Sequence, residues 1–219
     1  MNRHIAIDGP AGAGKSTIAK ALAKRKGLIY VDTGAMYRAF GLFLLRNEID
    51  VNDEDAVIKA CESADVSIAF ENGEQVVLLD GENVNGLIRT EAVGNMASAC
   101  SAIARVREIM VARQQQLAKE KDVVMDGRDI GTVVLPDAHT KIYLTASTKV
   151  RAKRRFDELT EKGVACDLAK IEEDIKERDH RDMNRAASPL RQAEDAVLVD
   201  TSDLTIEEVI EKILEISNG

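Results

Sequence analysis

The feature that most constrains this chain is a glycine-rich turn at residues 9–16, Gly-Pro-Ala-Gly-Ala-Gly-Lys-Ser, between a short apolar run and a helical pattern. Glycines let the backbone curl until successive amides point at one centre. The helix that follows adds its free N–H groups and the positive end of its dipole. A tight turn that merely joins a strand to a helix would not need the lysine and the serine. The spacing G-x-x-x-x-G-K-S therefore predicts a loop that binds the phosphates of a nucleoside triphosphate.

Each part of this loop has an expected task. The side chain of Lys15 is long enough to reach the β- and γ-phosphates, and the hydroxyl of Ser16 can hold Mg²⁺. The residues expected to contact the triphosphate are Gly9, Pro10, Ala11, Gly12, Ala13, Gly14, Lys15, Ser16 and Thr17. The loop predicts the ligand, but it does not predict what is done with it.

The bulk composition excludes several classes of protein. The 219 residues carry 30 Lys and Arg against 38 Asp and Glu, a formal net charge of −8 that argues against a general affinity for nucleic acid. No apolar stretch reaches the length of a membrane span, so we expect no membrane contact. Cys61, Cys100 and Cys166 are far apart and form no C-x-x-C pair, which is typical of reduced thiols in a cytoplasmic protein.

Short apolar runs alternate with helical patterns along most of the chain, which favours a parallel sheet covered by helices on both faces. We expect five buried strands, at residues 5–7, 28–32, 123–126, 141–144 and 196–200. Helices are expected at residues 15–26 and 35–46, and a capping box at residues 205–208 opens a closing amphipathic helix. The pattern predicts an α/β fold, a five-stranded parallel sheet with the phosphate loop at its carboxyl edge.

One segment breaks this alternation. Residues 66–70 and 75–79 predict a β-hairpin around an Asn72-Gly73 turn, and a second turn at Asp80-Gly81 could return a short third strand. A small antiparallel sheet of this kind cannot stand alone. We therefore interpret residues 64–86 as a mobile insertion on a single domain that spans residues 1–219. A surface hairpin without a function is the alternative.

Arginines stand at the ends of several expected strands and helices. Two of them follow strands, three share one predicted helix and three share one face of another: Arg38 and Arg128; Arg151, Arg154 and Arg155; Arg178, Arg181 and Arg185. A planar guanidinium binds two phosphate oxygens at once and keeps its charge. Any one of them could lie on a solvated helix face instead. Together they favour phosphoryl transfer between two anions, because the mutual repulsion of the anions must be cancelled.

Longer strings carry a resemblance to a known family. They are residues 8–16, residues 32–38 (Asp-Thr-Gly-Ala-Met-Tyr-Arg), residues 126–134 (Asp-Gly-Arg-Asp-Ile-Gly-Thr-Val-Val) and residues 176–185 (Lys-Glu-Arg-Asp-His-Arg-Asp-Met-Asn-Arg). Through them the chain resembles the bacterial cytidylate kinases, which are P-loop nucleoside monophosphate kinases, essentially from end to end. The last two strings are far more specific than the phosphate loop.

The resemblance implies transfer of the γ-phosphoryl group of ATP, with Mg²⁺, to CMP or dCMP. It places the insertion in the monophosphate-binding region and makes residues 148–165 an arginine-rich lid over ATP. No polymeric nucleic acid or membrane is expected as a partner. The absence of an obvious exposed apolar stripe favours a monomer, and the expected location is the cytoplasm.

The resemblance also implies roles for individual residues. The expected phosphate contacts to the monophosphate are Arg38, Arg128 and Arg185, the expected pentose contacts are Arg178 and Asp182, and the expected lid contacts to ATP are Arg154 and Arg155. The expected catalytic group is Lys15, Asp126, Arg128 and Arg185, in which Asp126, at the end of an apolar strand, could hold a magnesium-bound water. Thr33 stands where the family often has serine, so the hydroxyl is kept and the added methyl should alter packing more than role.

The resemblance further implies that Ser98, Arg107 and Asp129 recognise cytosine. The base offers an amino donor beside two acceptors, so a carboxylate and a hydroxyl can accept from the amino group while an arginine donates to the acceptors. The O4 atom of uracil would face Asp129 unfavourably. This set is what would separate cytidylate from uridylate as a substrate.

Each role has a plainer alternative that the sequence leaves open. In that interpretation the residues are only structural: Asp126 caps a turn, Asp129 pairs with Arg128 or a helix end, Ser98 is a small helical residue, Arg107 is a surface arginine paired with Glu108 or Glu120, and Asp182 pairs with Arg178. For the whole chain the alternatives are another small-molecule P-loop kinase, such as one for uridylate or shikimate, and an ATP-driven switch or binding module. The absence of an N-K-x-D motif argues against a GTPase.

Overall fold

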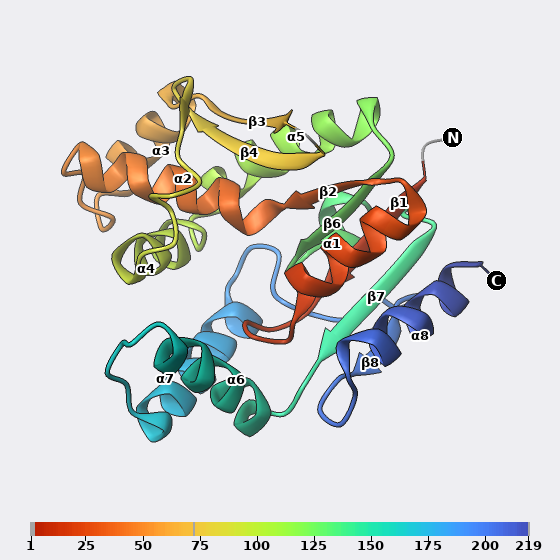
Figure 1. The fold of residues 1–219 in the computed structure, drawn as a ribbon. Coiled ribbons are helices and arrows are strands. Elements are labelled where there is room, and N and C mark those ends of the chain that lie inside the picture. Colours follow the sequence, from red (N-terminus) through yellow and green to blue (C-terminus); the bar gives the residue numbers. More distant parts are fainter. Residues whose placement is uncertain (1–2, 72, 219) are drawn as a thin grey trace. The chain divides into compact units, whose positions relative to one another are not determined.

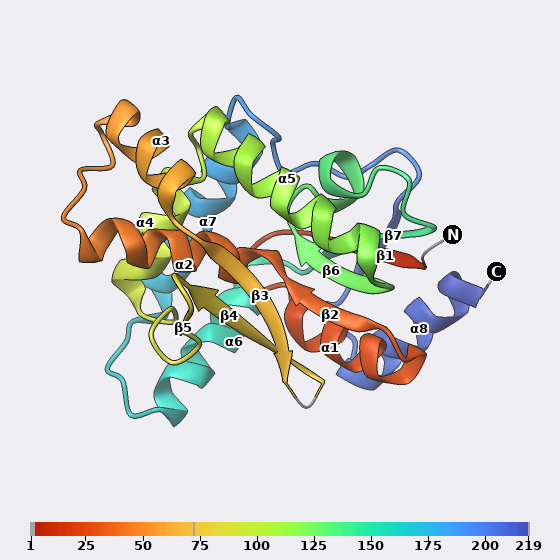
Figure 2. The same ribbon diagram turned by 90° about the horizontal axis from the view of Figure 1, so that it is seen from above.

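The computed structural model describes residues 3–71 and 73–218 (Figure 1 and, from above, Figure 2). Its strands are β1 His4–Asp8, β2 Ile29–Asp32, β3 Val66–Glu71, β4 Glu74–Leu79, β5 Glu82–Asn83, β6 Val123–Gly127, β7 Thr140–Thr145 and β8 Val197–Asp200. Its helices are α1 Lys15–Lys26, α2 Thr33–Arg46, α3 Glu54–Ser63, α4 Glu91–Cys100, α5 Ala104–Glu120, α6 Thr148–Glu161, α7 Leu168–Asn184, α8 Ile206–Asn218 and a short π-helix, η1 Ile130–Val134.

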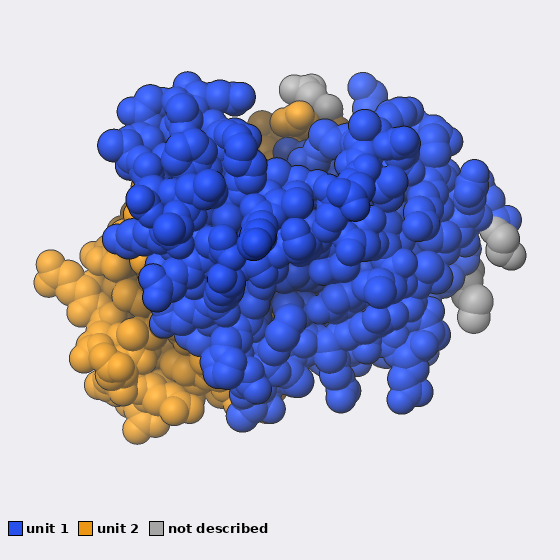
Figure 3. All heavy atoms as spheres, turned by 90° about the horizontal axis from the view of Figure 1, so that it is seen from below, with its two compact units in different colours: residues 1, 3–28, 124–219 blue, residues 2, 29–123 orange. Residues whose placement is uncertain are grey.

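The described residues fall into two compact units, which Figure 3 shows in different colours. Unit 1 contains residues 3–28 and 124–218, and unit 2 contains residues 29–71 and 73–123. The boundaries that the sequence suggested for the insertion and for the lid stay predictions.

The main sheet has the strand order β2-β6-β1-β7-β8. In unit 1, β1 pairs with β7 in parallel, with Ile5 opposite Thr140, and β7 pairs with β8 in the same sense. The residues of β1 and β6 are almost all buried, as in strands that are covered on both faces. The predicted five-stranded parallel sheet is confirmed, and the phosphate loop follows its middle strand.

Side chains at the helix starts explain where two helices begin. Asp32 accepts a hydrogen bond from the backbone N–H of Ala35 at 2.9 Å, so α2 begins at Thr33 and not at residue 35 as predicted. Thr205 and Glu208 exchange hydrogen bonds between side chain and backbone at 2.8 and 3.3 Å, and this predicted capping box opens α8. No helix in the described part of the chain is long and apolar enough to cross a bilayer.

A separate antiparallel sheet, β3-β4-β5, belongs to unit 2. Val66 lies opposite Leu79 in β3 and β4, and Leu79 lies opposite Glu82 in β4 and β5. The predicted hairpin and its short third strand are therefore present. The expected turn at Asn72-Gly73 includes residue 72, which lies outside the described residues.

The core of unit 2 is built on α2. The side chains of Phe40 and Leu44 are fully buried there. Gly41 lets α2 and α4 approach closely, because a Cβ at this position would lie 3.0 Å from the backbone nitrogen of Ala97 and 3.1 Å from the backbone oxygen of Val93. The helix that carries Arg38 is thus fixed by packing along its length.

Truncation of Phe40 tests this packing. We expect Phe40→Ala to lower the free energy of unfolding by about 3–5 kcal/mol, because it removes a fully buried ring and leaves a cavity. The measurement is urea denaturation followed by circular dichroism. Leu45→Ala, on an exposed position of the same helix, is the matched control and should cost much less. Equal losses in the two variants would contradict the packing described here.

Candidate active site

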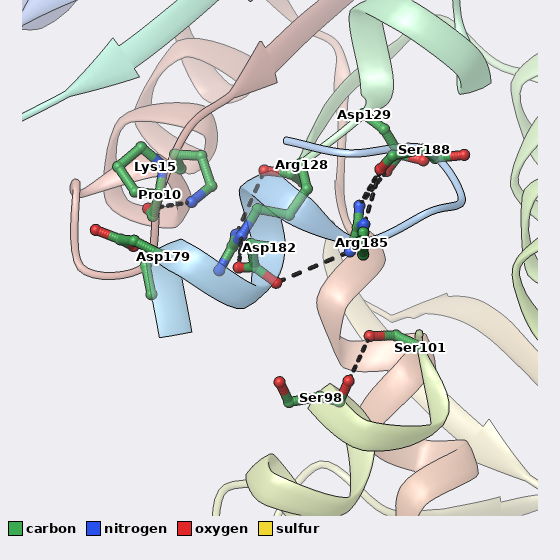
Figure 4. A network of polar contacts seen from close by, with 12 residues as sticks. Pro10, Lys15, Ser98, Ser101, Arg128, Asp129, Asp179, Asp182, Arg185 and Ser188 are labelled. Carbon is green, nitrogen blue, oxygen red and sulfur yellow. Dashed lines mark hydrogen bonds and ion pairs between the residues drawn. The ribbon is translucent and has the colours of Figure 1, made fainter. Parts of the chain in front are cut away.

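The phosphate loop joins β1 to α1 in unit 1. Gly9 is required at its start, because a Cβ there would lie 1.9 Å from the backbone oxygen of Leu144 in β7. Lys15 is buried, and its ammonium donates a hydrogen bond to the backbone oxygen of Pro10 at 2.8 Å (Figure 4). The lysine side chain therefore lies across its own loop and does not extend into solvent.

The surroundings of Lys15 destabilise its charge. Burial and the charge of Arg128 lower the pKa of Lys15 to about 7, although Asp126 and Asp8 act in the opposite direction. Two cations from different motifs thus lie close enough to repel each other. Such an arrangement suits a ligand that brings several negative charges.

Ser16, at the start of α1, meets Asp126 near the end of β6. The hydroxyl of Ser16 donates a hydrogen bond to Oδ2 of Asp126 at 3.2 Å. Both side chains offer the oxygen ligands that Mg²⁺ takes, and the ion usually completes its shell with waters and substrate phosphates. The pair therefore fits Mg²⁺. Among the described residues, no group of three or more His, Cys, Asp or Glu could hold a metal ion by itself.

Asp182 on α7 joins two of the arginines that the sequence placed at the monophosphate. Arg128 donates through Nε to Oδ2 of Asp182 at 2.8 Å, and Nη1 of Arg185 lies 3.8 Å from Oδ1 (Figure 4). Burial raises the pKa of Asp182, but Arg128 together with Arg178 and Arg185 holds it below its usual value. Asp182 is therefore an anion at neutral pH. It holds Arg128 and Arg185 side by side, so it is more than a partner of Arg178.

Asp129 also lies beside Arg185. Nη2 of Arg185 is 3.9 Å from Oδ1 of Asp129, and the same guanidinium donates from Nε and Nη2 to the backbone oxygen of Ser188 at 2.8 and 2.6 Å. The carboxylate of Asp129 is buried. Arg128, Asp129, Asp182 and Arg185 thus form one connected group in unit 1.

Arg151 of α6 is buried, unlike an arginine that reaches over a ligand from a lid. It donates through Nη2 to Oδ2 of Asp179 on α7 at 2.7 Å and through Nη1 to the backbone oxygen of Ala11 in the phosphate loop at 3.0 Å. A third bond runs from Nε to the backbone oxygen of Ala146 at 2.8 Å. Arg151 therefore ties α6, α7 and the phosphate loop together.

The other two arginines of α6 differ from it and from each other. Arg154 donates to the side-chain and backbone oxygens of Thr201, after β8, at 3.2 and 2.8 Å. Arg155 is exposed and pairs with Glu158 one turn along the helix at 2.8 Å. Their expected contacts to ATP stay predictions.

In unit 2, Asp32 holds two guanidiniums. Nη2 of Arg38 and Nη2 of Arg89 donate to Oδ2 of Asp32 at 2.9 and 3.1 Å. The side-chain amide of Gln75, on β4, accepts from the backbone N–H of Asp32 at 2.7 Å and donates to its backbone oxygen at 3.4 Å. Sequence reasoning missed Arg89, because an arginine in a loop 57 residues from its partner carries no local pattern.

Two of the residues expected to recognise the base are linked in unit 2. Arg107 is buried on α5 and donates to the backbone oxygen of Ser101 at 3.3 Å, and the hydroxyl of Ser101 donates to the backbone oxygen of Ser98 at 2.9 Å. The guanidinium of Arg107 also lies 5.4 Å from the ring centroid of Tyr37. The interpretation of Arg107 as a surface arginine is therefore wrong. Thr33 is buried at the start of α2.

The expected site residues thus divide between the two units. Unit 1 holds Gly9, Pro10, Ala11, Gly12, Ala13, Gly14, Lys15, Ser16, Thr17, Asp126, Arg128, Asp129, Arg154, Arg155, Arg178, Asp182 and Arg185. Unit 2 holds Thr33, Arg38, Ser98 and Arg107. Within each unit the structure joins the residues described above.

Two solved structures of kinases have a fold similar to that of this chain. The shikimate kinase of Bacteroides thetaiotaomicron superposes with a TM-score of 0.53 at 14% sequence identity, over 99% of this chain and 99% of that one. A gluconokinase from Sinorhizobium meliloti 1021 superposes with a TM-score of 0.50 at 12% identity, over 99% of this chain and 91% of that one. Likeness at such low identity shows the fold alone, and it confirms the predicted P-loop kinase architecture.

Sequence relatives are far more similar. The cytidylate kinase of Caldicellulosiruptor saccharolyticus is 54% identical over 213 residues, which cover 97% of this chain and 94% of the relative. The cytidylate kinase of Bacillus licheniformis is 50% identical with the same coverage. The family model described as cytidylate kinase matches residues 5–218. The resemblance drawn from the motifs is confirmed, and the chain belongs to the cytidylate kinase family.

Proposed function

We propose that this chain transfers the γ-phosphoryl group of ATP to CMP or dCMP, giving ADP and the corresponding diphosphate. Family membership makes it a phosphotransferase that acts on cytidylate, and it does not favour an ATP-driven switch or a kinase for another small molecule. The structural observation that carries the proposal furthest is the buried lysine of the phosphate loop, whose charge is destabilised by burial and by the charge of Arg128. Two mutually repelling cations at the phosphate loop would be stabilised by the phosphates that meet in this reaction.

Ser16 and Asp126 are the residues that would hold Mg²⁺. The hydroxyl of Ser16 would coordinate the ion, and Asp126 would orient one of its waters, in keeping with their contact at 3.2 Å. The bound ion would neutralise charge on the β- and γ-phosphate oxygens. Lys15 would exchange its hydrogen bond to Pro10 for one to these oxygens, which would restore the stability of its charge.

Arginines would bind the phosphate of the acceptor. We assign this task to Arg38, Arg128 and Arg185, each of which is held by a carboxylate: Asp32 for Arg38 and Asp182 for the other two. Side chains fixed in this way need little reordering when a phosphate arrives. The acceptor oxygen is already an anion, so no general base is needed.

The base and the sugar would be recognised by neighbouring residues. Asp129 and Ser98 would accept from the amino group of cytosine, and Arg107 would donate to its ring acceptors. Arg178 and Asp182 would contact the pentose. The contacts that fix Ser98, Ser101 and Arg107 relative to one another in unit 2 support a specific arrangement of donors and acceptors.

The remaining assignments concern the donor and the setting. Arg154 and Arg155 would contact ATP from the region of residues 148–165, with the loop residues 9–17 around its phosphates. We further propose that the enzyme is a monomer in the cytoplasm, and that it binds neither polymeric nucleic acid nor a membrane. The net charge of −8 supports the proposal that the enzyme does not bind polymeric nucleic acid.

One assay tests the function as a whole. ADP release is followed with ATP and Mg²⁺ in the presence of CMP, dCMP, UMP, AMP, GMP or no acceptor. Rapid release with CMP and dCMP and little without an acceptor is the expected result. Equal release with and without acceptors would refute the kinase and indicate an ATPase or a switch.

Removal of Arg128 tests the phosphate site. We expect Arg128→Ala to lower kcat with CMP by about 10²–10³-fold, because a preorganised donor to the reacting phosphates is lost. Arg25→Ala is the matched control in the same unit, since Arg25 is bound only to Glu207 and Glu211 in its surface pairs and should leave kcat unchanged. A value of kcat for Arg128→Ala within twofold of the wild type would remove Arg128 from the site.

Substitution of Asp129 tests base recognition. We expect Asp129→Ala to narrow the ratio of kcat/KM for CMP over UMP by about tenfold or more, since one polar contact of this kind discriminates by about 1–3 kcal/mol. The measurement is the initial rate with each acceptor at saturating ATP. Equal losses with CMP and UMP would show that Asp129 does not read the base.

A further inference from the structure

A buried carboxylate stands directly before the phosphate loop, and none of the roles assigned above uses it. Asp8 is the last residue of β1 and is 4% exposed. Its Oδ1 accepts a hydrogen bond from the backbone N–H of Ile130, and its Oδ2 accepts one from the N–H of Gly131, both at 2.7 Å. One side chain thus connects two segments that are more than 120 residues apart in the chain.

The two N–H groups belong to the start of η1, which comes directly after Arg128 and Asp129. The first N–H groups of a helix have no partner within the helix. In η1 the backbone bonds begin later, where Val133 and Val134 donate to the backbone oxygen of Asp129 at 2.9 and 3.2 Å. The side chain of Asp129 does not cap the helix. Asp8, the last residue of β1, accepts from these N–H groups instead.

The atoms around this contact are closely packed. A Cβ on Gly131 would lie 3.3 Å from Oδ2 of Asp8 and 3.2 Å from Cδ of Lys141 on β7. The backbone of η1 is therefore enclosed between the carboxylate and the lysine stem. Without the two hydrogen bonds to Asp8, the start of η1 and the residues that precede it would no longer be held in this position.

We propose that Asp8 is a positioning residue for phosphoryl transfer, which holds Arg128 and Asp129 in place relative to the phosphate loop. Asp8 is joined to Gly9 by a peptide bond on one side and to the backbone after Asp129 by two hydrogen bonds on the other. One carboxylate thus links the phosphate loop to the segment that bears Arg128. The inference rests on the proposed function, because it concerns the geometry of that reaction.

The charge of Asp8 gives the contact a pH dependence. Burial raises its pKa to about 6, although the two N–H donors oppose this rise. As the pH falls through this value, Asp8 takes up a proton. The protonated oxygen is a much weaker acceptor than a carboxylate oxygen, so the hydrogen bond from one of the two N–H groups is weakened. In the described part of the chain, the charged or titratable groups around Asp8 include Lys15 in the loop and Asp129 before η1. On β7 they include Tyr143 and Lys141, which is paired with Asp195.

The test uses Asp8→Asn, which keeps the shape of the side chain but replaces one acceptor by a donor at every pH. We expect kcat with CMP to fall about 10–100-fold, because a small displacement of Arg128 is costly in this reaction. KM for ATP should change less than about threefold, because the loop residues that bind its phosphates are intact. Asp53→Asn is the matched control, since Asp53 likewise caps a helix by accepting an N–H, from Ala56 at 3.0 Å, and should leave kcat unchanged.

Nuclear magnetic resonance reads the contact without substrates. This readout is needed because the phosphate of CMP titrates near the same pH, at about 6. In the wild type, the amide signals of Ile130 and Gly131 should shift with a midpoint near pH 6, and in Asp8→Asn this shift should vanish. Amides that do not respond to pH in this range, or a kcat of Asp8→Asn within twofold of the wild type, would overturn the proposal.

A second variant covers the case in which Asp8→Asn does not fold. Gly131→Ala keeps the carboxylate but presses a methyl group against it, so it should lower kcat in the same direction and move the Ile130 amide signal. Unchanged kcat and unchanged signals in this variant would overturn the proposal as well. A wild-type enzyme that releases no ADP with CMP would refute the proposed function, and the amide titration would then still report whether Asp8 holds η1.

Discussion

Cations that repel one another are held together in this protein by buried carboxylates. Asp182 contacts Arg128 and Arg185 in unit 1, and Asp32 contacts Arg38 and Arg89 in unit 2. Each carboxylate balances part of the charge and fixes the direction of two guanidiniums. All three arginines proposed for the acceptor phosphate depend on this arrangement, because neighbouring guanidiniums that share no carboxylate would repel each other.

Asp182 and Lys15 differ in how well their charges are stabilised. The arginines around Asp182 lower its pKa because they stabilise the carboxylate anion, whereas burial and the charge of Arg128 lower the pKa of Lys15 because they destabilise its cation. The charge imbalance is therefore concentrated at the loop. A polyanion that binds there would offset this imbalance, so the repulsion between the cations favours its binding. The arginines proposed for the acceptor phosphate, by contrast, are each paired with a carboxylate.

Much of the fold could be predicted from local sequence. The phosphate loop, the buried strands, the capping box at Thr205 and the hairpin each have a pattern confined to a few neighbouring residues. The start of α2 at Thr33 was missed because it depends on the side chain of Asp32. The three arginines of α6 looked equivalent, yet Arg151 is buried and Arg155 is exposed. Contacts such as Arg151 with Asp179 or Asp8 with Ile130 join distant residues, and no spacing rule reveals them.

The side-chain amide of Gln75 connects the small sheet to the backbone of Asp32. This amide pairs with the N–H and the oxygen of Asp32 as a neighbouring strand would. The carboxylate of Asp32 is thereby left free to serve the two arginines and the helix start. The strands of the hairpin also contact α2, so Gln75 is one of several links between the small sheet and the helix that carries Arg38. Residue 75 is thereby under a constraint that a hairpin position does not ordinarily have, because an amide is needed to serve both backbone groups of Asp32.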